Sequence, residues 1–183
     1  MKKDLRQVYI TKRKEISTSD REIYSQQIAT HFLNSEWMEY ETFHIFIPID
    51  KFNEINTRLI IQELWAKNKT VVVPKMKGKA LLNCAYTPET LLAKNSWGIE
   101  EPKNHKEIPA SQIDVVIVPM LIADKNGNRI GYGGGFYDRF LPTLRRDVQL
   151  VGINYFEPIA HIDHEEHDIP LDALITPKGV VKF

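Results

Sequence analysis

The sequence has a single cysteine, no net charge and no long apolar run, and each shortage excludes a class of protein. Cys84 has no second cysteine to pair with, so an internal disulfide framework is excluded and a buried structural thiol is favoured over a nucleophile. No segment approaches the roughly 18 apolar residues of a membrane span, and the first residues lack the apolar core of a signal peptide. We therefore expect a cytoplasmic protein that makes no membrane contact.

The charges balance, with 24 Lys and Arg against 24 Asp and Glu among 183 residues. A balanced chain has no overall field that would hold a nucleic acid, so we expect small-molecule partners bound at a local site. The length suits one domain with its own core, and no internal repeat or linker divides it. We expect a single domain over residues 1–183, as a monomer, with a dimer as the alternative.

Three short β-branched runs, each followed by a proline, predict buried parallel strands at residues 42–47, 70–73 and 114–118. Helical spacing of apolar residues alternates with them, which favours the α/β class. A capping box at residues 19–22 opens one of the helices, and a short helix should follow Pro88. Helices are expected at 3–16, 19–34 and 57–67, and further strands at 80–86, 149–156, 173–176 and 180–183.

Four of the nine glycines lie within five residues, at 131 and 133–135, between a strand-like run and an aromatic-rich segment. Such clustering indicates a backbone that needs positive φ or comes very close to another group. A strand, glycines and a helix start together present free N–H groups to a phosphate. Neither common nucleotide loop matches, because Phe136 stands where the Walker loop needs lysine and where the dinucleotide fingerprint needs a small residue.

Charged residues flank the glycines, and they favour a nucleotide site. Arg129 and Arg139 could hold phosphates, while Asp138 could bind Mg²⁺. The alternative is a glycine-rich turn whose arginine and aspartate pair with each other. A second Mg²⁺ carboxylate is expected from the acidic segment near residues 161–172, with Asp168 or Asp172 as the candidates; the histidines of that segment make zinc a disfavoured alternative.

Other candidate residues have two interpretations each. Glu54 lies in a polar loop after a buried strand, where open α/β sheets bind ligands, and the alternative is a solvated loop acid. Trp97 could stack on a flat ligand ring or fill the core. His44 is expected to be a satisfied core histidine. The basic residues near the start are expected on a solvated helix face, from which Arg6 could still reach an anionic ligand.

Residues 127–139 closely resemble the signature of 5-formyltetrahydrofolate cyclo-ligases, also called methenyltetrahydrofolate synthetases. Residues 2–6, 48–57, 97–102 and 167–172 support the resemblance, which covers essentially the whole chain in order. It implies a three-layer α/β/α domain with a mostly parallel central sheet. It also implies an enzyme of one-carbon metabolism that converts 5-formyltetrahydrofolate to 5,10-methenyltetrahydrofolate, with ATP as co-substrate and Mg²⁺ as cofactor, by phosphorylating the formyl oxygen before ring closure.

The resemblance also implies roles for individual residues. Mg²⁺ would be bound by Asp138 and Asp168, and catalysis would involve Arg129, Tyr137 and Arg139. Phe136 stands where many relatives have tyrosine, so no hydroxyl role is assigned there. The folate would be contacted by Arg6, Ile47, Glu54, Trp97, Tyr132, Gly133, Gly134, Gly135 and Phe136. The nucleotide would be contacted by Lys2, Lys3, Asp4, Leu5, Arg6, Arg129, Ile130, Gly131, Tyr132, Gly133, Gly134, Gly135, Phe136 and Tyr137.

Two other classes remain open at this point. A nucleotide-binding or RNA-binding module without catalysis could use the basic first helix and the exposed aromatics, although balanced charge disfavours RNA. A sugar-phosphate isomerase or acyl-CoA transferase-like enzyme could share the sheet architecture, and fold alone does not exclude it.

Overall fold

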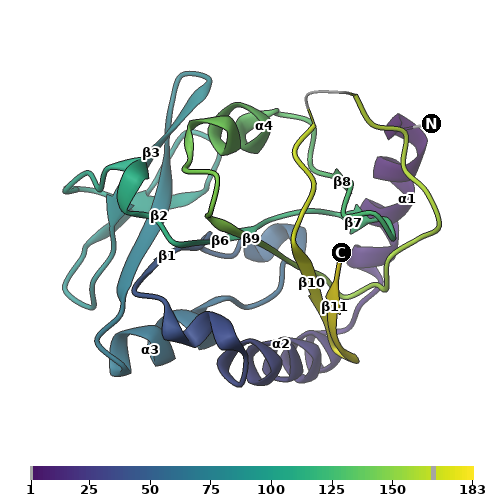
Figure 1. Cartoon of the computed structure of the whole chain (residues 1–183), viewed down its shortest axis with the longest axis horizontal. Helices are drawn as coiled ribbons and strands as arrows, with labels where there is room; N and C mark the ends of the chain where they lie inside the picture. The colour runs from purple at the N-terminus through teal and green to yellow at the C-terminus, as the bar shows by residue number, and fades with distance from the viewer. Residues whose placement is uncertain (1, 166–167) are drawn as a thin grey trace.

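The fold is built on a seven-stranded sheet in the order β11-β10-β9-β6-β1-β2-β3 (Figure 1). This computed structural model describes residues 2–165 and 168–183. β1, β2, β6, β9 and β10 run parallel, while β3 and β11 pair antiparallel at the two edges, which confirms the α/β class with a mostly parallel sheet. The strands are β1 (Thr42–His44), β2 (Thr70–Lys77), β3 (Ala80–Ala85), β6 (Val115–Val118), β9 (Gln149–Ile153), β10 (Ala173–Thr176) and β11 (Gly179–Lys182).

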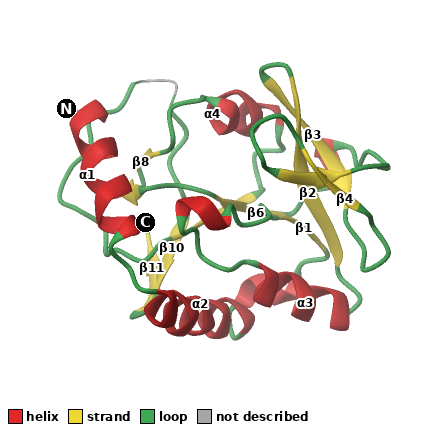
Figure 2. Cartoon of the chain, turned by 180° about the vertical axis from the view of Figure 1, so that it is seen from behind, coloured by secondary structure: helices red, strands yellow, loops and turns green. Residues whose placement is uncertain are grey.

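Helices lie on both sides of this sheet. Figures 1 and 2 show α2 and α3 on one face, α4 on the other, and α1 at the side, next to β8. The α-helices are α1 (Lys2–Lys14), α2 (Thr18–Leu33), α3 (Arg58–Ala66) and α4 (Phe136–Phe140), and the 3₁₀ turns are η1 (Glu36–Glu39), η2 (Asp50–Phe52), η3 (Ala110–Gln112) and η4 (Leu141–Thr143). Two small antiparallel sheets pair β4 (Leu92–Lys94) with β5 (Glu100–Pro102) and β7 (Ile122–Ala123) with β8 (Arg129–Ile130). No described helix is long and apolar enough to cross a membrane.

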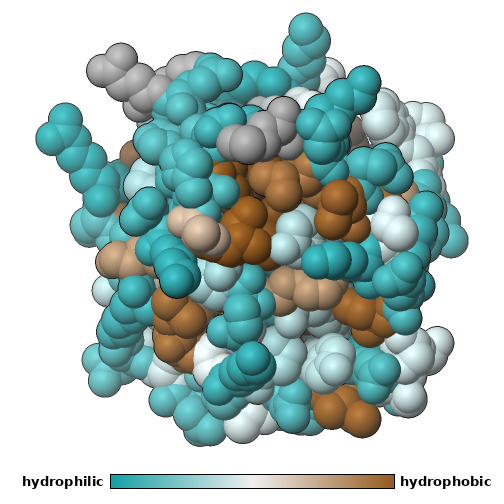
Figure 3. All heavy atoms as spheres, turned by 90° about the vertical axis from the view of Figure 1, so that its right-hand side faces the viewer, coloured by the Kyte–Doolittle hydropathy of each residue, from teal (hydrophilic) through white to brown (hydrophobic). Residues whose placement is uncertain are grey.

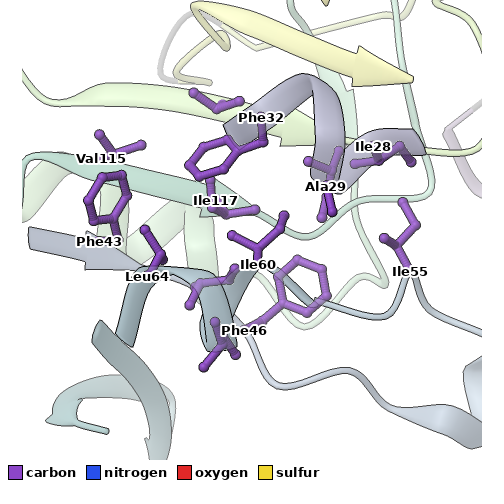
Figure 4. Packing of buried hydrophobic residues seen from close by; sticks show 14 of the residues in the cluster. Ile28, Ala29, Phe32, Phe43, Phe46, Ile55, Ile60, Leu64, Val115 and Ile117 are labelled. Atoms are coloured by element: carbon purple, nitrogen blue, oxygen red, sulfur yellow. The ribbon is translucent and has the colours of Figure 1, made fainter. Parts of the chain in front are cut away.

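Strand periodicity divides the core into two layers. Phe43, Val115 and Ile117 point to one face of the sheet. There they join a cluster with Phe32 of α2 and Ile60 of α3, all labelled in Figure 4. Phe32 and Phe43 meet edge to face with their ring centroids 6.0 Å apart. Because successive side chains of a strand alternate, the intervening residues of β6 are free to build the other layer.

The opposite layer is smaller and sits beneath α4. Val116 and Val118 of β6 cluster there with Leu150 of β9, Leu174 of β10 and Phe140 of α4. The helix ends at Phe140 and continues as the 3₁₀ turn η4, which contains Pro142, a residue without the N–H group that a longer α-helix would need.

A third cluster attaches α1 to the rest of the chain. Tyr9 of α1 packs with Ile122 and Ile130, which face each other across β7 and β8, and with Ile162. The side of the molecule that carries α1 shows apolar side chains gathered among hydrophilic ones (Figure 3). The amphipathic pattern of the first segment therefore predicted this helix correctly.

The expectation that Pro74 ends the strand is wrong, because β2 continues through it to Lys77. The carbonyl of Val72 accepts a hydrogen bond from the amide of Ile45, which follows β1. The polar backbone groups of a strand point to the same neighbour at every second residue, so the nitrogen of Pro74 also faces the β1 side. Pairing with β1 has ended there, at His44. A missing N–H group therefore costs no sheet hydrogen bond, and β2 remains paired with β3.

Two other local expectations are wrong. The cap of α2 is Ser17 rather than Ser19, since the Ser17 hydroxyl accepts from the amide of Asp20 at 3.0 Å and donates to its carboxylate. The expected helix after Pro88 does not form; the chain turns there, with the hydroxyl of Thr90 accepting from the amide of Thr87, and then enters β4.

The cysteine expectation is confirmed. Cys84 is fully buried on β3, and burial raises the pKa of its thiol to about 11. A thiol that stays protonated is a poor nucleophile, so this residue serves packing.

We expect Gly127→Ala to destabilise the fold more than Gly78→Ala. Both glycines have positive φ, at 81° and 60° respectively, so each alanine should cost about 1 kcal/mol of backbone strain. A methyl group at Gly127 would also lie 2.6 Å from the carbonyl oxygen of Leu171, whereas at Gly78 it meets nothing within 4 Å. Urea unfolding of both variants measures the difference, and equal costs would show that the contact at residue 127 relaxes freely.

Candidate active site

A cavity of about 640 Å³ lies between α1, the β2–β3 hairpin, β4–β5 and the glycine segment, which we define as residues 128–138. Its walls come from segments far apart in sequence. They are lined by Lys2, Arg6, Ile10, Arg13, Lys14, Phe46, Ile47, Ile49, Phe52, Glu54, Pro74, Met76, Leu81, Trp97, Ile99, Glu100, Glu101, Pro119, Leu121, every residue of the glycine segment, Asp168 and Ile169.

The cavity combines an apolar wall with a buried carboxylate. Glu54 is 3% exposed, which excludes the solvated loop acid considered from the sequence. One carboxylate oxygen accepts from the amide of Ile49 at 2.7 Å and the other from the hydroxyl of Tyr132 at 2.8 Å. Burial raises the pKa of Glu54, while these hydrogen bonds and the nearby guanidinium groups of Arg13 and Arg21 lower it. Glu54 thus faces the cavity with unused acceptor capacity.

A second part of the cavity is polar and carries two ion pairs. Arg129 donates to Asp138 at 2.6 Å and to the carbonyl of Ile169 at 2.6 Å. Lys2 donates to Asp168 at 2.9 Å. Burial lowers the pKa of Arg129, and the charges of both carboxylates oppose this shift. The pairing of arginine with aspartate, expected if the segment were a simple turn, is present, but it lies in the cavity wall.

The glycine segment connects the two parts. Arg6 of α1 donates to the carbonyl of Gly131 at 3.0 Å, and a methyl group at Gly133 would lie 3.2 Å from the Arg6 guanidinium carbon. Gly133 has φ of 98° as well, so the residue is required both by conformation and by this close approach. The helix that follows has only five residues, so phosphate binding would depend on cations and loop amides rather than on a long helix dipole.

Arg139 does not line the cavity, although the resemblance assigns it to catalysis. Its guanidinium donates to the carbonyl of Lys79 at 2.8 Å and to that of Gly134 at 2.8 Å. These bonds fasten the glycine segment to the β2–β3 hairpin. The geometry therefore gives Arg139 a supporting position behind the loop.

Tyr137 lies in the wall and is held from behind by a buried histidine. Its hydroxyl is 3.2 Å from Nε2 of His44, and Nδ1 of His44 is 3.2 Å from the side-chain oxygen of Asn83. The amide oxygen can only accept, so Nδ1 carries the proton and Nε2 accepts from Tyr137. Burial lowers the pKa of His44 to about 3, so the ring stays neutral. His44 is a satisfied core histidine, as expected, and it fixes a residue of the cavity.

The remaining predicted residues divide into those at the cavity and those beside it. Ile47 is buried in the wall, and Trp97 is 65% exposed at the rim, which excludes a core-filling role. Lys3, Asp4 and Leu5 do not line the cavity; Leu5 packs into the cluster beneath α1. The other predicted members of residues 2–6 and of the glycine segment are all brought together there.

Asp168 and Asp172, the two alternatives for the second metal carboxylate, differ in position, and Asp168 is the one that lines the cavity. Asp172 lies outside the cavity, where its carboxylate accepts from the amide of Leu150 at 2.7 Å. Of the acidic segment proposed for zinc, Glu166 and His167 lie outside the described residues.

Asp138 and Asp168 suit Mg²⁺ in chemistry. Mg²⁺ in nucleotide sites is commonly held by one or two carboxylates together with phosphate oxygens and water. Among residues 2–165 and 168–183, no group of three or more His, Cys, Asp or Glu gathers as a cage. Two carboxylates beside cations therefore fit an ion shared with phosphates rather than one enclosed by protein.

Sequence reasoning missed Arg13, which is 3% exposed in the wall although it was assigned to a solvated face. A signal existed, because Leu5, Tyr9 and Arg13 follow one another at helical spacing of four and share the buried side of α1. The β2–β3 hairpin also contributes two apolar residues that were missed, Met76 and Leu81. The expected end at Pro74 removed Met76 from its strand, whereas Leu81 fell in an expected strand that was not linked to the site.

Comparison with known proteins gives a consistent picture. The model of the family described as "5-formyltetrahydrofolate cyclo-ligase family" matches residues 1–177. A Haemophilus influenzae protein named 5-formyltetrahydrofolate cyclo-ligase is 33% identical, over 90% of this chain and 97% of the relative. An Escherichia coli protein of the same name is 32% identical, over 92% of this chain and 96% of the relative.

Solved structures agree in fold. The NMR structure of Aquifex aeolicus 5,10-methenyltetrahydrofolate synthetase superimposes with a TM-score of 0.85 at 26% identity, covering 99% of this chain and 92% of that one. A 5,10-methenyltetrahydrofolate synthetase from Mycoplasma pneumoniae superimposes with a TM-score of 0.77 at 23% identity, covering 96% and 98%, which supports the fold alone.

We expect His44→Gln to make the protein less sensitive to acid. The folded state holds His44 neutral down to pH of about 3, whereas the unfolded chain protonates it below about 6.5, so stability is lost as pH falls between these values. The loss is at most about 1.4 kcal/mol per pH unit. Unfolding free energies measured by urea across this range should fall less steeply for His44→Gln. The exposed His161→Gln serves as the control and should keep the wild-type slope.

Proposed function

The chain belongs to the 5-formyltetrahydrofolate cyclo-ligase family, and from this premise we propose that its cavity holds the folate at Glu54 and ATP at Arg129. Its reaction is the ATP-dependent conversion of 5-formyltetrahydrofolate to 5,10-methenyltetrahydrofolate with release of ADP and phosphate. The observation that carries the placement is the pairing of a buried carboxylate and a cationic wall within one cavity, joined by the glycine segment.

The pterin ring of the folate is proposed to lie at Glu54. A pterin presents adjacent N–H donors, and a carboxylate with free lone pairs accepts such donors well. The neighbouring wall is apolar, with Phe46 and Ile47 on one loop and Met76 and Leu81 on the hairpin, which suits a flat ring. Trp97 at the rim is proposed to cover the exposed part of the folate.

The nucleotide phosphates are proposed to lie between α1 and the glycine segment. Lys2, Arg6 and Arg129 bring positive charge to this part of the cavity, and the glycines leave the backbone accessible. Asp138 and Asp168 are proposed to hold Mg²⁺, which when bound neutralises charge on the phosphate oxygens. Each carboxylate would then exchange part of its present ion pair for the metal.

The contribution of these residues is orientation and charge. The formyl oxygen attacks the γ-phosphorus as the bond from that phosphorus to ADP breaks. The neighbouring folate nitrogen then attacks the activated formyl carbon, loses its proton and closes the ring, and phosphate leaves with the former formyl oxygen. Arg129 is proposed to offset charge on the transferred group. The hydroxyl of Tyr137 donates to His44, so toward the substrates it is proposed to act as an acceptor.

We also propose that the chain acts as a single domain and that a monomer contains the whole active site. The cavity draws its walls from residues 2 to 169 of one chain, so none of its described sides requires a second copy. The proposed Mg²⁺ and ATP sites lie in the same cavity as the folate site, as an in-line transfer requires.

Adding 5-formyltetrahydrofolate, ATP and Mg²⁺ to the protein should raise the near-ultraviolet absorbance as the conjugated methenyl product forms. Omitting ATP should abolish the change. Absence of product with all three components present would overturn the assignment of the reaction to this chain.

We expect Asp138→Asn and Asp168→Asn each to raise the Mg²⁺ concentration needed for half-maximal turnover by about tenfold or more, since each removes a charged oxygen ligand. Asp163→Asn, in the same loop as Asp168 but 58% exposed in its side chain and outside the cavity, should behave as wild type. Steady-state rates over a Mg²⁺ series give the comparison. Wild-type Mg²⁺ dependence in both cavity variants would contradict the proposed metal site.

A further inference from the structure

Arg13 is an arginine buried in the cavity wall without a part in the function proposed above. It lies in the last turn of α1 and is 3% exposed. Its guanidinium donates to the hydroxyl of Tyr132 at 2.5 Å and to the carbonyl of Met120 at 2.5 Å. An arginine so deeply buried has lost most of its hydration, and its partners must replace it.

The donor inventory fixes the direction of the hydrogen bonds. A guanidinium can only donate, so the hydroxyl oxygen of Tyr132 is the acceptor for Arg13. The single hydroxyl proton of Tyr132 is then available to Glu54, whose carboxylate oxygen lies 2.8 Å away. Arg13, Tyr132 and Glu54 thus form a chain of cation, hydroxyl and carboxylate with one direction.

Several groups surround the Glu54 carboxylate. The amide of Ile49 donates to it, Arg21 donates to the Glu54 backbone carbonyl at 2.6 Å, and the phenol of Tyr137 lies within electrostatic range. Burial raises the pKa of Glu54, and of the two guanidinium charges that oppose this shift, those of Arg13 and Arg21, that of Arg13 is the stronger. Without Arg13, the Tyr132 hydroxyl would have no donor that directs its proton to the Glu54 carboxylate.

We propose that Arg13 is a positioning residue for folate: it directs the Tyr132 hydroxyl to Glu54 and so keeps the carboxylate charged and oriented toward the pterin N–H donors. This rests on the proposed placement of the folate at Glu54. A charged acceptor forms stronger hydrogen bonds than a protonated one, so the arrangement favours binding of the substrate at neutral pH.

A purely structural role for Arg13 leads to a different expectation. Asn53 donates its side-chain amide to the carbonyl of Arg13 at 2.8 Å, which ties the end of α1 to the loop that carries Glu54. If Arg13 only held α1 in place, its loss would weaken ATP and folate binding together and at every pH. Loss of a positioning residue should weaken folate binding selectively and most strongly at low pH.

The test is the dissociation constant for 5-formyltetrahydrofolate, measured by calorimetry without ATP between about pH 6 and 9. For Arg13→Met we expect a Kd at least about tenfold above wild type near the acidic end and a smaller gap at higher pH, because loss of the guanidinium favours the protonated form of Glu54. Arg13→Lys should recover part of the affinity. The exposed Lys12→Met, one position earlier on α1, removes a cation outside the cavity and should leave binding unchanged.

Tyr132→Phe provides a second test if Arg13→Met does not fold, because it removes one oxygen from the chain of hydrogen bonds. It should show the same pH-dependent loss, and the double variant should bind no worse than either single variant. A Kd ratio independent of pH, or equal losses for folate and a non-hydrolysable ATP analogue, would overturn the role of Arg13. If wild type and Glu54→Gln bind the folate equally well, the placement at Glu54 fails instead.

Discussion

Charge buried inside the cavity has to be compensated by the protein itself, and this requirement ties the distant parts of the chain together. Glu54 and Arg13 are both about 3% exposed, and each forms hydrogen bonds with groups from other segments. A buried ion left alone would cost several kcal/mol, so α1, the loop after β1 and the glycine segment must arrive in register for any of them to be stable there. The sheet holds the strand ends in place, and these polar contacts fix the positions of α1, the loop after β1 and the glycine segment relative to one another.

Much of the fold was predictable because burial on a sheet imposes a period of two and burial on a helix imposes a period near four. The run at β6 and the first amphipathic helix were both located from such patterns. Pro74 misled the prediction because a missing amide matters only where a neighbouring strand needs it, and strand order is a property of the tertiary structure. The cap of α2 shifted to Ser17 for a similar reason: two serines compete locally, and φ and ψ of the chain entering the helix decide between them.

Cavity residues could be predicted where the backbone conformation leaves a mark in the sequence, and less well where their position depends on contacts with distant residues. The glycine segment could be recognised from the sequence, since four clustered glycines cost conformational entropy on folding unless the backbone must closely approach another group. Glu54 was a candidate from its place after a strand, whereas the acidic segment left Asp168 and Asp172 as alternatives until the family resemblance favoured Asp168. Arg13 looked like one of several solvated cations, and His44 like an inert core residue, because a hydrogen bond to a residue more than 90 positions away leaves no local pattern.

The exposed Trp97 gives this protein an optical property of its own. The buried Trp37 stacks on Phe32, the indole N–H of Trp65 donates to the carbonyl of Tyr86, and neither tryptophan lines the cavity. Trp97 alone among the three tryptophans stands in water at the rim. A molecule bound against Trp97 would change the emission of this indole, whereas Trp37 and Trp65 would supply a constant background.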